Sequence, residues 1–580
     1  MSAIELEMPT DLRSASALEA ASPESPGTPK GIIRLTVDTP LSSSKRISDQ
    51  KRPPPRWKTP EFILYEVLFL IVVPILVWIP IQLSDASHPN YDLYSHRLSQ
   101  GWLLGRDIDN SDTQYRSFRN NIPALVLLAA IFFGLKYIYD YFSNAPIPYH
   151  GSSSHPYRIP FLSAFSVLML VGLHGSSALK VLVIISLNYH IAKYFGASKL
   201  APIFTWVFNA AVLFANETNG GYKFAALHPS LEFLDSMNGA YPRWHVSFNI
   251  TMLRLVSFSM DHFWACNRNG TPDTGSVLNY RERISTPHTL SSYSYVNYLA
   301  YVLYPPLYIA GPIMTFNDFM WQLERPATIP RRSVATYALR FLSCLLTMEL
   351  MLHFMYVVAI KDSRAWQGDS PFELSMIGFW NLIIVWLKLL LPWRFFRLWA
   401  LMDGIDPPEN MVRCMANNYS PFGFWRAWHR SYNLWIIRYI HIPLGGTKNV
   451  AFTSLLIFTF VALWHDLSFR LLIWGWLASL FILPELMASK VFPASQYSGR
   501  PWYRHLCAAG AVFNILMMMS ANLVGFVIGT DGMSYMLSQL VGTWEGLRFF
   551  GIACVCLFIA AQVMFEYREE EMRQGIYRKC

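Results

Sequence analysis

Two histidines in one apolar stretch are the residues of this chain best suited to do chemistry. His429 and His465 stand 36 residues apart, between Phe422 and Asp466. An imidazole among apolar side chains loses hydration, so its presence there needs a reason. With an ordinary pKa of about 6.5, imidazole can accept a proton near neutral pH and act as a general base. We predict that His465 is a proton acceptor and that His429 assists it; an interior hydrogen-bonding role is the alternative for each.

The residues around His429 fit a single helix over residues 424–439. Aromatic residues recur there every three or four positions, and polar residues with the same spacing share another side. The aromatic stripe is Phe424, Trp428, Tyr432, Trp435 and Tyr439, and the polar set is Arg426, His429, Arg430 and Asn433. Such a stripe is more often packing than a binding surface, whereas the polar side could line a cavity or hold a re-entrant turn. The candidate substrate-binding residues are Arg426, Trp428, Asn433 and Trp464.

His465 closes an apolar run, with Trp464 before it and Asp466 after it. Adjacent residues on a helix point about 100° apart, so Asp466 is not automatically the orienting partner of His465. Pro443 and the glycines that follow it predict the end of the helix around His429 and a sharp return of the chain.

The composition of the whole chain is that of a helical membrane protein. Of its 580 residues, 53% are hydrophobic and 15% are charged, whereas soluble proteins have about 25% charged residues. Apolar runs of about 18 to 25 residues recur, each long enough to cross a bilayer as a helix. We therefore predict an all-α, polytopic transmembrane bundle of roughly 10–12 spans with re-entrant segments. The runs lie near residues 62–83, 122–142, 160–178, 179–195, 200–216, 246–264, 293–314, 335–360, 374–391, 467–489, 506–529 and 545–566.

Charged residues in or beside two of these runs support specific predictions. Arg254 and Asp261 are seven positions apart and share one helical face, so they point either into the protein or into the membrane interface. Arg394 and Arg397 stand among aromatic residues after the run 374–391, which predicts an interfacial anchor.

The segments at the two ends of the chain differ from the membrane domain between them. Residues 1–57 are rich in Ser and Pro and predict a disordered tail, because they cannot bury enough apolar area to offset the entropy of ordering. Residues 58–570 form the predicted membrane domain, and residues 571–580 a short C-terminal tail.

The placement of Lys and Arg predicts the orientation in the membrane. Basic residues before residue 60 and at the C-terminus place both ends in the cytosol. The segment 530–544 has no Lys or Arg and fits the lumenal side, whereas the loop 490–505 has three basic residues and fits the cytosol. If residues 467–489 make one span, His465 lies toward the lumen.

Several other functions are disfavoured. The net charge of +9 fits basic residues that meet anionic headgroups, and we predict no nucleic-acid partner. The seven cysteines show neither a disulfide framework nor metal-ligand spacing. No internal repeat is evident, which weakens a transporter built from inverted repeats. Short glycosylation sequons at Asn216, Asn269 and Asn418 are weak signals, since such matches are frequent by chance.

The pattern F-W-x-x-W-H-x-S-x-x-x-W-x-x-x-Y-x-x-x-P-L-G-G, followed by an apolar run and then W-H, resembles the membrane-bound O-acyltransferase (MBOAT) superfamily. Upstream, Ala310-Gly311-Pro312-Ile313 looks like that family's A-G-P-I segment. The run WALMDGIDPPENM at 399–411 is similar to the fungal glycerol-uptake-protein branch, which is related to Hedgehog acyltransferase. The resemblance covers about residues 60–570, with His441 as a small departure where relatives tend to have Tyr or Phe.

The resemblance implies a helical bundle that encloses a tunnel, with acyl-CoA entering from the cytosol and the acceptor from the lumen or membrane. It gives His465 the role of the family's invariant histidine and His429 that of a second polar position. It implies remodelling of glycosylphosphatidylinositol (GPI) anchors in the endoplasmic reticulum, with a long fatty acid transferred to lyso-phosphatidylinositol. Acyl-CoA would be a co-substrate, and we expect no permanently bound cofactor. A glycerol transporter and a Hedgehog-type protein acyltransferase are the alternatives.

Overall fold

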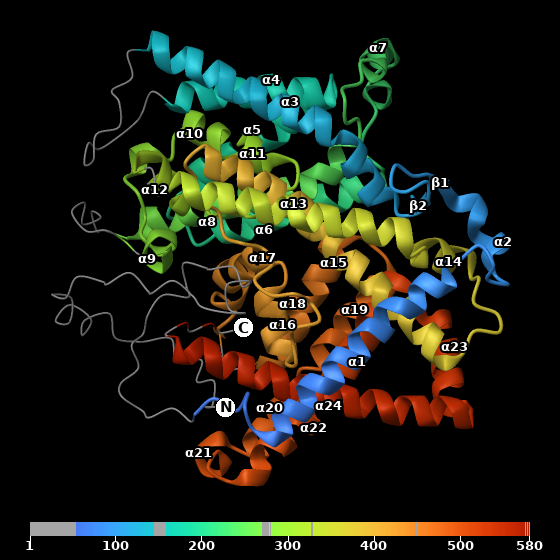
Figure 1. The fold of residues 1–580 in the computed structure, drawn as a ribbon. Helices are drawn as coiled ribbons and strands as arrows, with labels where there is room; N and C mark the ends of the chain where they lie inside the picture. Colours follow the sequence, from blue (N-terminus) through green and yellow to red (C-terminus); the bar gives the residue numbers. More distant parts are fainter. Residues whose placement is uncertain are drawn as a thin grey trace.

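Helices form almost all of the structure (Figure 1). This computed structural model describes residues 54–143, 158–268, 278, 280–325, 329–446, 450–574, 576 and 578. Most of the predicted tail 1–57 and the sequon at Asn269 lie outside the described residues. The prediction of an all-α bundle is confirmed, although the polar segment after the first span contains a small β-hairpin in addition to short helices.

The first part of the chain contains five long helices, with the hairpin between the first and the second of them. Thr59 caps the first helix by accepting a hydrogen bond from the backbone N–H of Phe62, a bond that satisfies one of the unpaired donors at a helix start. The elements are α1 (Pro60–Leu83), α2 (Tyr91–Tyr94), η4 (Ser95–Arg97), β1 (Leu98–Gln100), β2 (Asp107–Asp109), α3 (Thr113–Phe142), α4 (Arg158–His174), α5 (Ser177–Phe195), α6 (Ala201–Thr218), η5 (Phe224–Ala226), η6 (Pro229–Leu231) and α7 (Glu232–Ser236).

The middle part contains two breaks that the sequence analysis did not predict. The predicted span 293–314 is interrupted before Pro305, where a proline starts a new short helix, because proline has no N–H to continue the preceding one. The predicted span 335–360 is interrupted at Met355. The elements are α8 (Trp244–Asn267), α9 (Tyr280–Ser285), η7 (Leu290–Ser292), α10 (Tyr295–Val302), α11 (Pro305–Tyr308), α12 (Phe316–Glu324), α13 (Arg331–Phe354), α14 (Val357–Ser363) and α15 (Pro371–Met402).

The last part holds the stretch with the two histidines and two π-helical turns, η8 and η10. The elements are α16 (Pro421–Ala427), α17 (Arg430–Ile436), η8 (Ile437–His441), α18 (Val450–His465), α19 (Phe469–Leu480), α20 (Leu483–Val491), α21 (Ala494–Tyr497), α22 (Pro501–Asn522), η10 (Leu523–Val527), α23 (Gly529–Gly542) and α24 (Trp544–Arg573). Thus α24 continues past the predicted domain boundary at residue 570.

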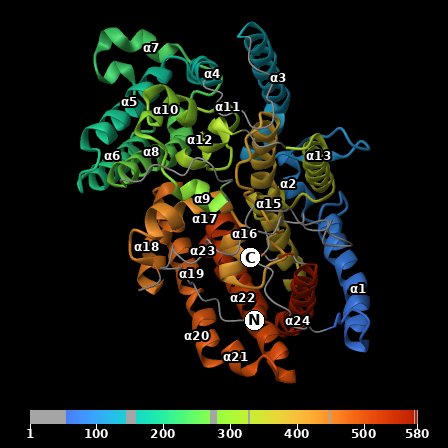
Figure 2. The same ribbon diagram turned by 90° about the vertical axis from the view of Figure 1, so that its left-hand side faces the viewer.

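Eight helical segments of the described residues are long and apolar enough to cross a membrane, and α4 and residues 452–465 of α18 are shorter apolar helices. Together they match the lower end of the predicted range. In the most apolar window of α15, 61% of the residues are buried, against 6% in α3. Helix α15 lies inside the bundle and contacts α1, α3, α11, α13, α23 and α24 (Figure 2). The outer helices leave an apolar surface that suits lipid.

The charged residues within the apolar runs face the protein. Arg254 donates hydrogen bonds to the carbonyls of Val302 and Leu307, and Asp261 accepts from Arg438 at 2.7 Å. The predicted interfacial anchor is wrong, because Arg394 and Arg397 are only 9% and 6% exposed. The cause is tertiary: α15 continues through this segment, and Arg397 pairs with Asp406 at 2.6 Å.

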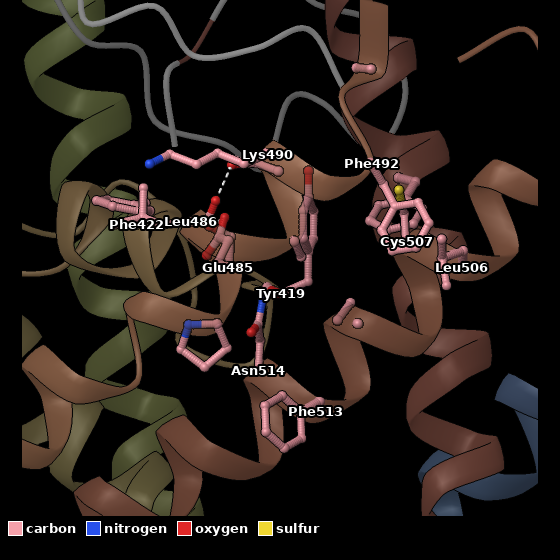
Figure 3. Close-up of a pocket in the computed structure, with 18 of the residues that line it drawn as sticks. Tyr419, Phe422, Glu485, Leu486, Lys490, Phe492, Leu506, Cys507, Phe513 and Asn514 are labelled. Carbon is pink, nitrogen blue, oxygen red and sulfur yellow. Dashed lines mark hydrogen bonds between the residues drawn. The ribbon is translucent and has the colours of Figure 1, made fainter. Parts of the chain in front are cut away.

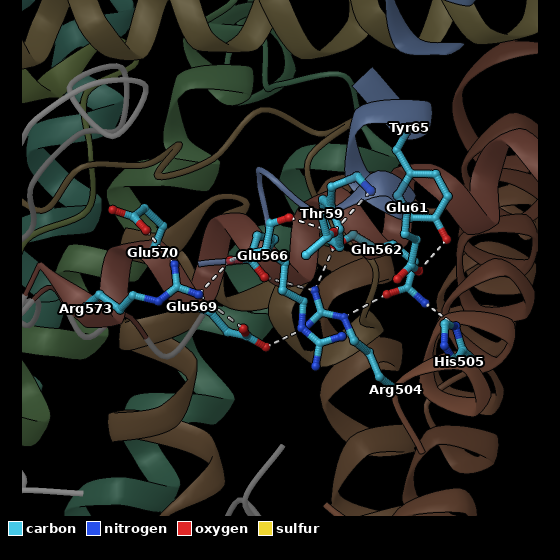
Figure 4. A network of polar contacts seen from close by, with 12 residues as sticks. Thr59, Glu61, Tyr65, Arg504, His505, Gln562, Glu566, Glu569, Glu570 and Arg573 are labelled. Atoms are coloured by element: carbon cyan, nitrogen blue, oxygen red, sulfur yellow. Dashed lines mark hydrogen bonds and ion pairs between the residues drawn. The ribbon is translucent and has the colours of Figure 1, made fainter. Parts of the chain in front are cut away.

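Both described ends of the chain lie at the same end of the bundle. The backbone N–H of Arg56 donates to Glu566 of α24 at 3.0 Å. Arg504, at the start of α22, pairs with Glu566 at 3.4 Å and with Glu569 at 2.6 Å (Figure 4). The two ends and the loop 490–505 therefore share one side, as charge placement predicted. That this side is cytosolic stays a prediction.

Candidate active site

The chain breaks its helix at His429, so the single helix predicted over residues 424–439 is wrong. Ser420 caps α16, which ends at Ala427, and Trp428 is extended. His429 then adopts a left-handed conformation, with φ 45° and ψ 46°, before α17 starts at Arg430. A non-glycine residue held there costs about 1–3 kcal/mol, and such strain is typical of functional sites. The break moves His429 out of the predicted polar face.

Aromatic rings surround the His429 imidazole. Trp393 of α15 stacks on it, with ring centroids 4.5 Å apart and an angle of 20° between the planes. Tyr432 lies 5.1 Å away, and the indole of Trp464 lies 6.4 Å away. His429 is half-buried, so one side of the imidazole is fixed by packing while part of it stays accessible.

Trp464 joins the two histidines. Its ring lies 4.8 Å from that of His465 and 6.4 Å from that of His429. The indole N–H donates to the carbonyl of Asn249 at 2.9 Å, and the Asn249 amide donates back to the Trp464 carbonyl at 3.2 Å. This reciprocal pair fixes the end of α18 against α8.

His465 is the last residue of α18, and it is exposed. Trp474 of α19 flanks it at 6.2 Å and contacts Phe526 beyond α22 at 5.0 Å. Helix α22 has 22 residues, a length of about 33 Å, and starts at the Arg504 end. His465 therefore lies nearer the end of the bundle away from the termini; that this end is lumenal stays a prediction.

Asp466 follows His465 in the sequence, and its carboxyl group lies near that of Glu217, at the end of α6. Partial burial and the charge of Asp466 raise the pKa of Glu217. Asp466 thus has a carboxyl partner from another helix, in keeping with the expectation that it need not orient His465.

The predicted substrate-binding residues separate into two groups. Trp464 lies between the histidines, and the backbone N–H of Asn433 donates to the His429 carbonyl at 3.0 Å. Trp428 stacks on Phe424, 5.4 Å away, which is the packing role expected of an aromatic stripe. Arg426 lies over the ring of Phe422 and lines a separate cavity.

That cavity, of about 400 Å³, lies between α16, α20 and α22 (Figure 3). Its wall is mostly apolar, with Glu485 accepting from Ser420 at 2.6 Å. Phe422 and Leu486 in its wall, together with Trp425, pack against a buried cluster formed by Phe458, Ala478 and Ile482. The Trp425 ring lies 5.7 Å from that of Trp474, so a continuous column of apolar side chains separates the cavity from His465.

Comparison with known proteins identifies the family of this chain. Residues 235–530 match the model of MBOAT, the membrane-bound O-acyltransferase family. Membrane-bound O-acyltransferase GUP1 of Candida tropicalis is 46% identical over 560 residues, which cover 94% of each chain. The chain belongs to the membrane-bound O-acyltransferase family. Members of this family are acyltransferases.

Two further MBOAT relatives indicate the branch. GUP1 of Saccharomyces cerevisiae is 45% identical over 574 residues, covering 94% of this chain and all of that protein. The mouse protein-cysteine N-palmitoyltransferase HHAT is 31% identical over 197 residues, covering 32% of this chain and 39% of that protein. The resemblance to the fungal branch, with the Hedgehog acyltransferase more distant, is confirmed.

Within this MBOAT domain, the sequence analysis missed residues that hold His429. Neither Trp393, next to the predicted interfacial anchor at Arg394, nor the loop residue Asn410 was singled out. The position of Trp393 directly after Pro392 in an apolar run did not reveal that its ring stacks on a histidine 36 residues away.

The sequon asparagines at positions 216 and 418 are buried. Asn216 and Asn418 are 2% and 6% exposed, so the folded protein has no room for a glycan on either side chain.

Proposed function

We propose that this chain is an acyl-CoA-dependent O-acyltransferase that transfers a long fatty acyl group to a lipid hydroxyl. In this proposal His465 is the general base and His429 assists it. The observation that favours this most is the placement of an accessible imidazole at the end of an apolar helix, with a second imidazole across Trp464, inside the part of the chain that matches the MBOAT family.

The proposed chemistry is a single transfer. The acceptor hydroxyl attacks the thioester carbonyl carbon while the imidazole of His465 takes its proton, because a hydroxyl is a poor nucleophile at neutral pH. The C–S bond then breaks, the acyl group stays on the acceptor oxygen, and the departing thiolate takes up a proton to give free CoA. General-base assistance of this kind is worth about 10²- to 10⁴-fold.

The surroundings of the histidines suit this reaction. The rings of Trp393, Trp464 and Trp474 cover the imidazoles from several sides and would limit hydrolysis of the thioester by excluding water. The cavity between α16 and α22 is mostly apolar and could hold part of a fatty acyl chain, and the packed side chains between it and His465 would have to move for that chain to reach the imidazole. We propose Trp464 and Asn433 as substrate contacts near the histidines, and Arg426 and Trp428 as more distant ones.

For the acceptor we propose the lyso-phosphatidylinositol of a GPI anchor. The matches to the fungal GUP1 relatives extend over almost the whole of both chains. These matches and the run at 399–411 support placing this protein in the fungal glycerol-uptake-protein branch. We further propose that it resides in the endoplasmic reticulum membrane with both termini cytosolic and His465 toward the lumen. The partial match to a protein-cysteine N-palmitoyltransferase favours a peptide as the second candidate acceptor.

The test is acyl transfer by the purified protein. Labelled long-chain acyl-CoA is offered with lyso-GPI, with lysophosphatidylinositol or with a peptide that begins with cysteine. We expect an acylated lipid, and His465→Ala should lower the rate by about 10²- to 10⁴-fold. The matched control is His441→Ala, at a half-buried histidine of η8, which should retain activity.

A folded His465→Ala protein with full activity would refute the assignment of the base. Acylation of the peptide but of neither lipid would replace the proposed acceptor. If no acceptor is acylated and glycerol instead crosses liposomes that contain the protein, the transporter alternative prevails.

A further inference from the structure

The left-handed turn at His429 has no cap of its own. A helix start leaves its first backbone N–H groups without partners inside the helix, and the N-cap side chain usually accepts from one of them. His429 occupies the N-cap position of α17, yet its side chain makes no capping hydrogen bond. The imidazole is therefore not used by the backbone, and the donors of Arg430 and Ser431 need acceptors from elsewhere.

Asn410 supplies both acceptors. It belongs to the loop between α15 and α16 and is 0% exposed. Its backbone carbonyl accepts from the N–H of Arg430 at 3.0 Å, and its side-chain Oδ1 accepts from the N–H of Ser431 at 3.0 Å. A residue distant in sequence thus caps α17 in place of the N-cap histidine.

Ser431 extends this arrangement to a third segment. Its Oγ accepts from the backbone N–H of Ile313 at 2.8 Å, which belongs to the Ala310–Ile313 segment. Trp393 stacks on the imidazole of the same turn. His429 is therefore fixed both through its backbone and through its ring.

The loop that presents Asn410 is itself anchored on both sides. Before it, Glu409 accepts from the hydroxyl of Tyr337 at 2.7 Å. After it, the N–H of Val412 donates to the carbonyl of Ala427 at 3.2 Å. Because these hydrogen bonds fix the residues on either side of Asn410, its two acceptor oxygens stay in a defined position and do not move with the turn at His429.

We propose that Asn410 is a positioning residue for His429. By capping α17, Asn410 keeps the strained turn in place, so that the imidazole of His429 lies against Trp464 and faces the site. This inference deepens the proposed function, because it assumes that His429 assists the transfer. Asn410 acts through His429 and touches no substrate itself.

The first test is kinetic. Asn410→Ala should lower kcat by about 10- to 100-fold, since small misplacement of a reacting group can cost about 10²-fold, with KM for acyl-CoA changed less than about twofold. Asn410→Asp keeps the Oδ1 acceptor and should recover most of kcat. The matched control is Asn418→Ala, which removes another buried asparagine of the same loop, one that donates to the Cys414 carbonyl; its kcat should stay close to the wild-type value.

A double-mutant comparison distinguishes loss of the position of His429 from a general loosening of the structure around Asn410. In a His429→Ala background, Asn410→Ala should cost little further activity, because there is no imidazole left to position. If Asn410→Ala lowers kcat by the same factor with and without His429, or if Asn418→Ala lowers it equally, the proposal is overturned.

Hydrogen exchange tests the same inference without activity. Asn410→Ala should speed exchange at the amide of Ser431 by about tenfold or more, because this amide loses its Oδ1 acceptor, whereas the acceptor of Arg430 is the backbone carbonyl of residue 410, which the variant keeps. Unchanged exchange at Ser431 overturns the proposal even if kcat falls. If the wild-type protein transfers no acyl group, the proposed function fails, whereas this measurement still decides whether Asn410 holds the turn.

Discussion

A buried ion pair ties the C-terminal helix to the loop before the candidate site, and breaking it should loosen that loop. Glu571 of α24 accepts two hydrogen bonds from Arg413, at 3.0 Å and 2.6 Å. Their side chains are 2% and 0% exposed, and Arg578 also donates to Glu571. The perturbation is Glu571→Gln, which keeps the size of the side chain and removes its charge.

The expected magnitude follows from this burial. Removing one partner of a buried pair costs about 3–5 kcal/mol, because the remaining charge stays buried without compensation. At about 1.4 kcal/mol per tenfold change, the lower figure corresponds to roughly 10²-fold more frequent opening of the loop, provided that the loop opens locally.

Hydrogen exchange in detergent measures this opening. The informative amides are those of Val412, which donates to Ala427, and of Asn417, which donates to Cys414. The matched control is Glu570→Gln, whose carboxylate pairs with Arg573 at a partly exposed position and should change exchange by less than about threefold. Equal protection of these amides in both variants would refute the reasoning that the buried pair holds the loop.

Two further predictions concern pH and helix packing. Burial and the neighbouring Glu373 raise the pKa of Asp369 to about 6, so its contribution to stability is present at low pH and is lost as the pH rises from about 4 through about 6. Asp369→Asn, which mimics the neutral carboxyl, should raise Tm at pH 7.5 and change it little at pH 4.5. An equal change in Tm at the two pH values would contradict the raised pKa of Asp369. A Cβ at Gly475 would lie 2.8 Å from the Phe458 carbonyl oxygen, so Gly475→Ala should push α19 away from α18. The substitution should lower the free energy of unfolding by about 1–3 kcal/mol, and with it both Tm and the rate of acyl transfer. Gly551→Ala, where a Cβ meets nothing within 4 Å, should be neutral or slightly stabilising, and similar melting of the two variants would count against this packing.

The sequence was sufficient for the class of fold and for the residues of greatest chemical interest. Long apolar runs with few charges predict helices, because lipid offers the backbone no hydrogen-bond partners and each span must satisfy its own. The same scarcity of water made His429 and His465 conspicuous, and the structure places both rings against Trp464. Their catalytic roles stay predictions.

The break at His429 could not be predicted from the sequence, because local spacing favours a continuous helix through residues 424–439. Asn410 accepts from the backbone beside the left-handed turn and Trp393 stacks on its imidazole, and neither residue lies within that stretch. The positions of Arg394 and Arg397 could not be predicted either. Their aromatic neighbours in the sequence favour a membrane interface, but in the structure acidic side chains from the following loop pair with Arg397 and hold it inside the protein.

Periodicity along one segment determines which residues share a face and how many spans the chain can make. Contacts between segments decide where a helix must break, which charges are paired, and which side chain caps a helix that does not cap itself. These contacts join residues such as Asn249 and Trp464 or Arg413 and Glu571, far apart in sequence, and they depend on how the whole bundle packs. The sequence alone therefore determined a helical membrane protein with two conspicuous histidines, and only the tertiary structure decided how His429 is held beside His465.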